Sequence, residues 1–433
     1  MTPQSTFMVV APIADGKRAE LEALLASMTS VACLADPANG LVPFERFDRL
    51  HFARFVILDP QTLGDIGVYG GTPAPWVPAL AFLADCDGDA ANLVDQLVVD
   101  AEPGLRRIFA HCTDFGPSTD LRYWLLAHAA RPTASYVNWI GRTVRQIREE
   151  AALRDALIGR ARQLGGESPP VSPSRLRDQL LEFVRAEAAA GRLTLSREQP
   201  TPPDWRARNL AHLIGVPLAL IALAPFLVIA SPVLLFLLRS HETSDPEITP
   251  RVPRERVSEL AAQEDHDFTN QFSAMGDVKP GWFRRWLVVA LLNLLDYASR
   301  HIYRRGYLSR VQTIHFARWV LLDDNRRLLF ASSYDGSLES YMDDFINKVA
   351  WGINVVFGNG VGFPRISWLF LGGAEFEGKY KRYLRRHQIP TQVWYKAYPG
   401  LSVADLNRNT LIRQGVEHPP EGQAATMAWL SLL

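Results

Sequence analysis

The chain has 433 residues, of which 48% are apolar and 21% charged, typical of a globular protein of two or three domains and not of a disordered one. Lysine plus arginine and aspartate plus glutamate both total 46, which excludes the basic field that nonspecific nucleic-acid binding needs. Three cysteines without CxxC spacing argue against a disulfide framework or a zinc site and favour a reducing cytoplasmic setting.

The chain begins with an apolar run, FMVVAPIADG at residues 7–16, that no basic segment precedes. This pattern predicts a first strand and not a signal peptide, so we expect most of the chain to remain in the cytoplasm. A helical stretch, KRAELEALLASM, follows at residues 17–28.

A strand-like run at residues 50–59, LHFARFVILD, reappears at residues 314–323 as IHFARWVLLD, with seven of ten positions identical. Residues 80–88 similarly match residues 328–336, and each of these segments ends in Asp-Gly before a helical pattern. A last strand follows a Pro-Thr pair in both halves. The sequence therefore predicts for each half the order strand, helix, strand, strand, helix, strand.

This βαββαβ order is that of a ferredoxin-like unit. We predict an α+β protein made of two ferredoxin-like halves, residues 1–150 and 269–433, that are related by internal duplication. Two such units can pair their sheets into a joint or barrel-like core. Residues 151–268 have no counterpart in the repeat and contain an amphipathic charged helix at residues 175–192.

The inserted region also contains residues 210–238, which include no Asp, Glu, Lys or Arg and exceed the length of a bilayer-seeking segment. A single crossing would separate two halves that we expect to pair. Pro217, Pro225 and Pro232 each remove a helix hydrogen bond, and both arms around Pro225 are too short to cross about 30 Å. We favour a re-entrant, monotopic hairpin at the cytoplasmic face of the inner membrane over a single span or a buried core helix.

A second segment agrees with this interpretation. Trp282, Arg284, Arg285 and Trp286 precede a short apolar helix, and basic residues follow it. Aromatic and basic residues around an apolar helix are typical of an interfacial element, so the second half is expected to face the membrane. A core helix with arginines that reach solvent is the alternative.

Polar residues of the repeat are candidates for chemistry. They are His51 and His315, Arg54 and Arg318, Asp59 and Asp323, Asp87 and Asp335, and Asp95 and Asp343. Strand alternation places His315 and Arg318 on opposite faces unless a bulge intervenes. A buried Arg318 would need a carboxylate, for which Asp335 and Asp343 are candidates. The alternative is a repeated salt bridge or helix cap, since Asp-Gly-Ser at a strand end can also cap the next helix.

The C-terminal half carries more polar groups within apolar elements, among them Tyr334, Asn359 and His387. The two expected halves, the aspartate in Tyr334-Asp335-Gly336 and the arginine at position 318 resemble the dimeric α+β barrel superfamily and, within it, the dye-decolorizing peroxidases. Ser332 stands where that family's GxxDG motif has glycine. The second half is also similar to uncharacterised bacterial proteins that carry VKPGWFRR, HFARW, YDGSxESY and HQIPTQVWY.

The peroxidase resemblance implies haem as cofactor. His315 or His387 would ligate the iron, Asn359 and Tyr334 would line the cofactor site, and Asp335 and Arg318 would act on peroxide. The expected function is then a membrane-associated protein that binds or oxidises a hydrophobic small molecule in a haem-dependent, peroxidase-like reaction. A non-catalytic monotopic membrane scaffold or partner subunit is the alternative. The expected partners are the lipid bilayer and a hydrophobic small molecule, not nucleic acid, and a homo-oligomer stays open.

Overall fold

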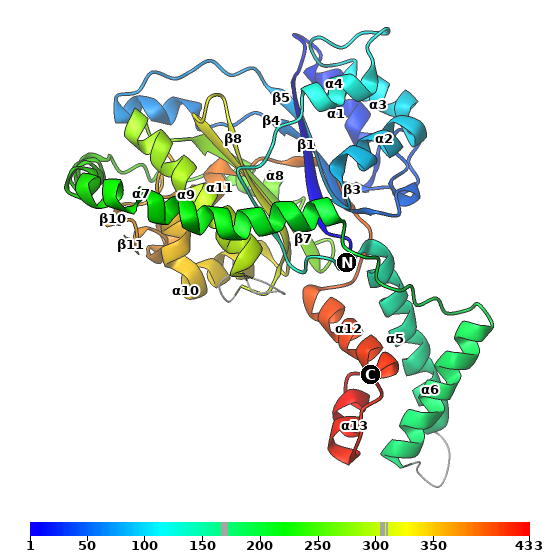
Figure 1. The fold of residues 1–433 in the computed structure, drawn as a ribbon. Helices are drawn as coiled ribbons and strands as arrows, with labels where there is room; N and C mark the ends of the chain where they lie inside the picture. Colours follow the sequence, from blue (N-terminus) through cyan, green and yellow to red (C-terminus); the bar gives the residue numbers. More distant parts are fainter. Residues whose placement is uncertain (166–171, 304–307, 309–310) are drawn as a thin grey trace.

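The computed structural model describes the whole chain except residues 166–171, 304–307 and 309–310. The described part is a mixed α+β structure, which confirms the predicted class. Two open sheets face each other, and helices cover their outer faces (Figure 1). The central strands are buried on both sides because one face meets helices and the other meets the second sheet.

The first sheet has the strand order β1-β5-β4-β12-β3-β2. Its strands are β1 (Gln4–Pro12), β2 (Thr29–Val31), β3 (Leu34–Ala35), β4 (Leu50–Leu58), β5 (Ala79–Asp87) and β12 (Thr391–Lys396). The second sheet has the order β6-β8-β9-β7. Its strands are β6 (Ala134–Val137), β7 (Thr269–Asp277), β8 (Ile314–Leu322) and β9 (Arg327–Asp335). A small hairpin of β10 (Ile366–Ser367) and β11 (Leu371–Gly372) is separate from both sheets.

The two halves repeat one pairing pattern. β1 pairs with β5 so that Phe7 lies opposite Ala84, and β7 pairs with β9 so that Phe272 lies opposite Ser332. The β4–β5 and β8–β9 ladders each contain a register shift at the histidine of the repeated HFAR motif. Positions that match in the sequence repeat therefore also match in strand register.

The last strand of each half, however, joins the sheet of the other half. β6 pairs with β8, with Tyr136 opposite Ala317, and β12 pairs with β4, with Tyr395 opposite Ala53. The expectation that each half closes a ferredoxin-like sheet of its own is therefore wrong for its fourth strand. The apolar pattern of a strand sets which face is buried, whereas its partner is whichever free edge the chain reaches.

Helices cover the outer face of each sheet (Figure 1). Those on the first sheet are α1 (Arg18–Ala26), α2 (Ala90–Asp100), α3 (Glu102–Phe109) and α4 (Leu121–Ala127), and those on the second are α9 (Trp282–His301), α10 (Leu338–Phe357) and α11 (Glu377–His387). Short 3-10 turns are η1 (Phe44–Arg46), η2 (Leu63–Tyr69) and η3 (Gly373–Glu375). Successive side chains of β1 point to opposite faces of the first sheet. Phe7 and Val9 pack beneath the helices, and Met8 packs against the second sheet.

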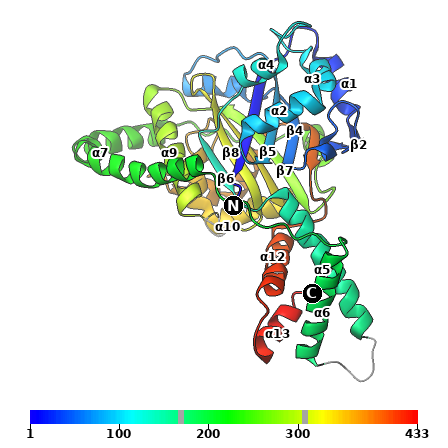
Figure 2. The same cartoon turned by 45° about the vertical axis from the view of Figure 1, so that its right-hand side comes forward.

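Four further helices form an extension that projects from the two sheets (Figure 2). They are α5 (Val144–Gly165), α6 (Pro173–Ala189), α12 (Val403–Glu417) and α13 (Gln423–Leu430). A separate apolar cluster that includes Leu153, Leu180, Ile412 and Trp429 holds them together. We call this extension the stalk. It joins helices that follow the last strand of each half, so both halves contribute to it.

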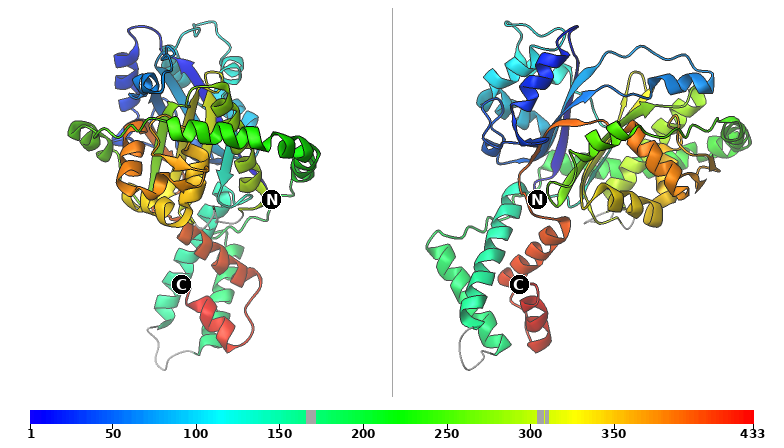
Figure 3. Two further views of the ribbon diagram at one scale, coloured as in Figure 1. Left: turned by 90° about the vertical axis from the view of Figure 1, so that its left-hand side faces the viewer. Right: turned by 180° about the vertical axis from the view of Figure 1, so that it is seen from behind.

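The predicted apolar segment lies within one helix, α7 (Pro203–Ser244), which α8 (Arg254–Ala261) follows. Pro217, Pro225 and Pro232 all lie inside α7, and none interrupts it. The helix bends instead, so that its two arms point in different directions (Figures 1 and 3). Prolines are the usual cause of such kinks, since each lacks a hydrogen-bond donor.

Candidate functional site

The register shift in each HFAR strand brings its histidine to the aspartate that ends the neighbouring strand. His315 Nε2 lies 2.7 Å from Asp335 Oδ1, and His51 Nε2 lies 3.0 Å from Asp87 Oδ1 at the equivalent place. The ring of His51 also contacts the Tyr398 hydroxyl through Nδ1, at 3.1 Å. Both histidines are buried. Each histidine is therefore already paired with an aspartate of its own half.

Each of these aspartates also caps a stalk helix. Asp335 Oδ2 accepts from the Val403 amide at 2.6 Å, at the start of α12, and Asp87 Oδ2 accepts from the Val144 amide at 2.8 Å, at the start of α5. A carboxylate at a helix N-terminus accepts a hydrogen bond from an otherwise unpaired amide, and its negative charge interacts favourably with the helix dipole. The following Ser337 caps α10. These contacts are those of the structural alternative, in which the repeated residues join strands to helices.

The repeated arginines cross from one sheet to the other. Arg318 donates to the carbonyls of Phe7 and Ala84, at 2.8 and 3.1 Å, and to the Asp85 carboxylate. The carboxylate that pairs with Arg318 is therefore Asp85 of the first half, not Asp335 or Asp343. The side chain of Arg318 extends from its own sheet to the facing one, and Asp85 is far from it in the sequence, so no local pattern could identify this partner.

Arg54 makes the matching contacts in the opposite direction. It donates to the carbonyls of Phe272 and Ser332, at 3.1 and 3.0 Å, and to the Ser333 hydroxyl at 2.9 Å. Ser333 occupies the position that Asp85 holds in the other half, so Arg54 has a hydroxyl where Arg318 has a carboxylate. Burial, followed by the nearby Arg318 cation, lowers the pKa of Arg54 to about 9.

The remaining repeated aspartates form local ion pairs. Asp343 pairs with Lys381 and Asp323 with Arg327, while Asp95 pairs with Arg122 and Asp59 with Arg18. Most of these carboxylates are partly or largely exposed. Each pair joins two residues of the same half, so these contacts do not bring the four aspartates together.

His387 and Asn359 do come together. Both line a small cavity of about 20 Å³ beneath α10 and α11, and neither His387 Nε2 nor Asn359 Nδ2 has a hydrogen-bond partner among the described residues. His387 Nδ1 lies 2.8 Å from the Tyr383 carbonyl, and burial lowers the pKa of the ring to about 4. A space of this size can hold a single water molecule.

The other C-terminal candidate, Tyr334, is buried elsewhere. Its ring stacks on Tyr341 with centroids 3.9 Å apart, and its hydroxyl has no hydrogen-bond partner among the described residues. Burial raises the pKa of Tyr334 well above its usual value. Tyr334 therefore contributes to the core of the second half and does not line the His387 cavity.

These residues do not fit a haem group. The Nε2 atom of His315 is engaged by Asp335, and the cavity beside His387 holds about 20 Å³, whereas ligand pockets for small molecules and cofactors run to several hundred. Among the described residues no group of three or more His, Cys, Asp and Glu side chains could hold a metal ion. The residues that the resemblance assigns to haem thus lie in separate places, and only His387 and Asn359 share a cavity, which is too small for the group.

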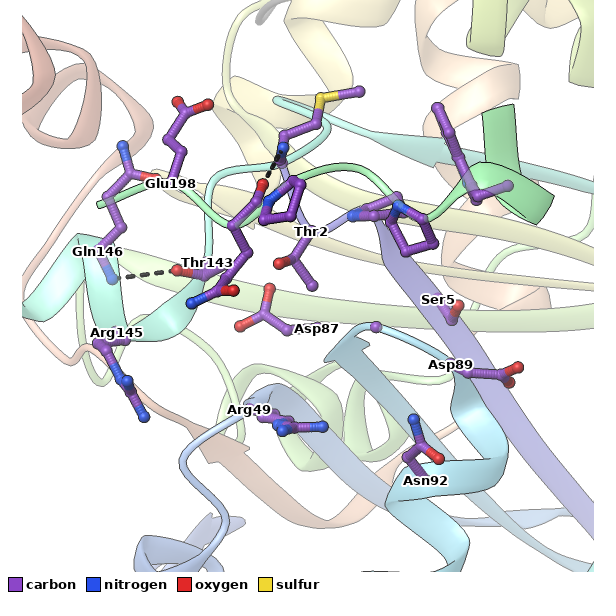
Figure 4. Close-up of a pocket in the computed structure, with 18 of the residues that line it drawn as sticks. Thr2, Ser5, Arg49, Asp87, Asp89, Asn92, Thr143, Arg145, Gln146 and Glu198 are labelled. Carbon is purple, nitrogen blue, oxygen red and sulfur yellow. Dashed lines mark hydrogen bonds between the residues drawn. The ribbon is translucent and has the colours of Figure 1, made fainter. Parts of the chain in front are cut away.

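A larger polar cavity opens where the first half meets the stalk and the start of α7 (Figure 4). Its volume is about 830 Å³, and a neighbouring cavity of about 660 Å³ shares Arg197, Glu198, Trp205 and Arg300 with it. Further lining residues are Arg49, Asp87, Asp89, Asn92, Arg145 and Arg208. Sequence reasoning missed this site, because its residues come from six separated segments without a motif.

The exposed surface of α7 is apolar. The most apolar stretch of this helix is unburied, and its length and composition would suffice to cross a membrane. Phe226 and Ile229 in the middle of α7 are 70% and 78% exposed. Trp282 and Trp286 on α9 are also exposed, at 65% and 66%.

Two basic residues assigned to that surface behave differently. Arg285 is half-buried, and Arg284 is fully buried. Arg284 donates to Asp245 at 2.6 Å and to Asn359 at 3.0 Å. The expectation that Arg284 reaches the membrane surface is therefore wrong. Its helical position turns it inward, where it holds the end of α7.

Comparison with models of protein families, with curated proteins and with solved structures found no match.

Proposed function

We propose that this protein is a monotopic membrane protein that inserts the bend of α7 into one leaflet and carries its two-sheet body and stalk on the same side. The observation that supports this most directly is that the chain before and after α7 is interleaved, since β6 pairs with β8 and β12 pairs with β4. Segments on both sides of α7 thus belong to one body. A helix that crossed the bilayer once would have to pull that body apart.

Both ends of α7 are fastened to the body, which supports insertion as a bent loop. At the first end the ring of His212 lies 5.7 Å from that of Tyr297, whose hydroxyl donates to the Leu213 carbonyl. At the second end Asp245 accepts from Lys279 at 2.8 Å and from Arg284 at 2.6 Å. These two attachments face opposite ends of α9, so the apolar part between them arches away.

The size of the arch agrees with one leaflet. His212 and His241 are separated by roughly 43 Å of helix at 1.5 Å per residue, whereas their ring partners on α9, Tyr297 and Phe283, are only roughly 21 Å apart along that helix. Two equal arms over such a base rise on the order of 19 Å. One leaflet measures about 15 Å of hydrocarbon and about 20 Å with its headgroups.

Vesicle flotation tests this proposal. The variant Ile221→Lys/Ile229→Lys places two charges on the exposed arch and should bind phosphatidylethanolamine–phosphatidylglycerol vesicles at least about 10-fold more weakly, because a lysine in hydrocarbon costs about 2.5–3.5 kcal/mol. The matched control Val99→Lys/Tyr123→Lys changes equally exposed apolar residues of α2 and α4 and should bind like the wild type. Equal binding of all three proteins would contradict the proposal.

The side of the membrane and the origin of the halves are part of the same proposal. We infer the cytoplasmic face of the inner membrane from the three free, buried cysteines. The matched register of the two halves supports descent from one duplicated unit that later exchanged its last strands. The described side chains offer no haem site, so the proposal does not extend to haem-dependent oxidation.

The polar cavity favours a second function, the binding of a small zwitterionic molecule near the membrane. Its lining combines arginines with carboxylates, and Trp205 and Arg208 place it at the start of α7. Glycerophosphoethanolamine, which carries both a phosphate and an amine, is a suitable probe. It should raise the Tm of the wild type but not of Arg197→Glu, while the control Arg192→Glu, outside the lining, should respond like the wild type. No shift in the wild type would exclude this function for that class of ligand.

A further inference from the structure

We infer that the β10–β11 hairpin is a second lipid-inserting element, which Glu242 of α7 holds in place. This inference rests on the proposed membrane function of α7. The hairpin tip consists of Trp368, Leu369 and Phe370, followed by Leu371 in β11. Trp368, Phe370 and Leu371 are 47%, 49% and 58% exposed. Consecutive large apolar side chains at a projecting turn are unusual for a surface that meets only water.

The backbone of this tip is strained. Trp368 and Leu369 have φ values of +54° and +65°, in the left-handed region that bulky residues rarely adopt. Such a conformation persists only where surrounding contacts enforce it, and it often marks a functional position. The tip is therefore built to present these side chains in one fixed orientation.

Glu242 supplies the enforcing contacts. Its two carboxylate oxygens each accept a backbone amide at 2.9 Å, one from Trp368 and one from Leu369. The Glu242 side chain is fully buried, and Arg239 pairs with it at 2.7 Å while lying over the Trp368 ring at 5.0 Å. The end of α7 and the hairpin are thus one rigid unit.

Asn354 of α10 satisfies the opposite side of the turn. Its Nδ2 donates to the carbonyls of Phe370 and Gly372, at 2.8 and 2.9 Å, and its Oδ1 accepts from the Ala374 amide at 2.8 Å. Backbone polar groups near hydrocarbon must be paired within the protein, because lipid offers no partner. At this tip the amides of Trp368 and Leu369 and the carbonyl of Phe370 are paired in this way, while the side chains of Trp368 and Phe370 are exposed.

The environment that suits the hairpin tip is the boundary between the headgroups and the acyl chains of a lipid leaflet. The hairpin lies beside the returning arm of α7, and Trp282 and Trp286 are exposed near the same end of α7, where His241 stacks on Phe283 (Figure 1). Tryptophan is enriched at that level of a bilayer because its ring is apolar and its N–H is polar. Continuity with the α7 arch favours a leaflet over a protein partner.

A cysteine-directed fluorophore distinguishes this inference from the function on which it rests. The three native cysteines are buried, so an NBD label will attach selectively to Phe370→Cys, Ile229→Cys or the control Val99→Cys. With vesicles of phosphatidylethanolamine and phosphatidylglycerol, the labels at 229 and 370 should both gain at least about twofold in intensity and shift to the blue, and the label at 99 should not. A response at 229 without one at 370 would overturn the hairpin inference alone. No response at 229 would overturn the membrane function itself.

Variants test the part played by Glu242. Glu242→Ala removes both acceptors, so it should reduce the response of the label at 370 at least about twofold while the label at 229 keeps its own. Trp368→Ser/Phe370→Ser keeps Glu242 and the turn, and it should weaken vesicle binding of the unlabelled protein at least about 10-fold. Unchanged binding by the double serine variant would contradict insertion of the tip. An unchanged response at 370 in Glu242→Ala would contradict the role of Glu242.

Discussion

Arg54 and Arg318 lie on facing sheets, and each donates to backbone carbonyls at equivalent positions of the sheet opposite. This reciprocal contact explains why the arginine recurs in both copies of HFAR. Only Arg318 also meets a carboxylate, that of Asp85. The two arginines are therefore equivalent in geometry but not in charge balance.

The unequal partners predict unequal effects of the same substitution. Arg318→Met leaves the buried Asp85 unpaired and should lower the free energy of unfolding by about 3–5 kcal/mol. Arg54→Met leaves only neutral acceptors and relieves repulsion with Arg318, so its cost should be about 1–3 kcal/mol. Urea unfolding followed by circular dichroism measures both. A larger loss for Arg54→Met would contradict this account of the charges.

Asp335 and Asp343 both recur in the sequence repeat, but they make different contacts: Asp335 is hydrogen-bonded to His315 and to the start of α12, whereas Asp343 forms an ion pair with Lys381. Asp335→Ala removes the contact to His315 and the cap of α12, and should cost about 2–4 kcal/mol. Asp343→Ala breaks only a partly exposed pair with Lys381 and should change stability by about 1 kcal/mol or less. Hydrogen exchange of the first turn of α12 would separate the two, since only Asp335→Ala should accelerate it.

Asp245 fastens the end of α7, and its removal should be costly. Asp245→Ala leaves the buried Lys279 and Arg284 without their carboxylate, so we expect a loss of about 3–5 kcal/mol and faster proteolysis at residues 245–253. Asp204→Ala at the other end of α7 breaks an exposed pair with Arg208 and should stay within about 0.5 kcal/mol of the wild type. Equal protease resistance of both variants would exclude Asp245 as the fastening point.

His387 should make stability depend on pH. Burial lowers its pKa to about 4 in the folded protein, whereas an exposed histidine of the unfolded chain titrates near about 6.5. Protons therefore bind the unfolded chain first, and stability that is complete above about pH 6.5 declines as the pH falls toward about 4. Between pH 7.5 and 5 this group should cost about 2 kcal/mol.

Urea midpoints of His387→Leu at both pH values test that dependence. The variant should lose about 2 kcal/mol less than the wild type when the pH is lowered, whatever its stability at pH 7.5. The control His418→Leu changes an exposed histidine and should keep the dependence of the wild type. An undiminished pH effect in His387→Leu would assign the acid sensitivity to other groups.

The sequence by itself determined the local features of this protein. The repeated HFAR strands, the Asp-Gly ends and the apolar helix are all encoded in runs of adjacent residues, whose periodicity states which face is buried. Matching positions of the repeat occupy matching register, and the amphipathic segment at 175–192 corresponds to α6.

Only the tertiary structure decided which groups meet across the halves. No local pattern shows that β6 joins β8, that Arg318 reaches Asp85, or that Glu242 holds Trp368, because a strand edge and a buried charge take whatever partner the folded chain brings near. The same holds for α7. Its composition shows only that it is apolar. The contact of His212 with Tyr297 of α9 and the pairing of Asp245 with Lys279 hold both of its ends against one body.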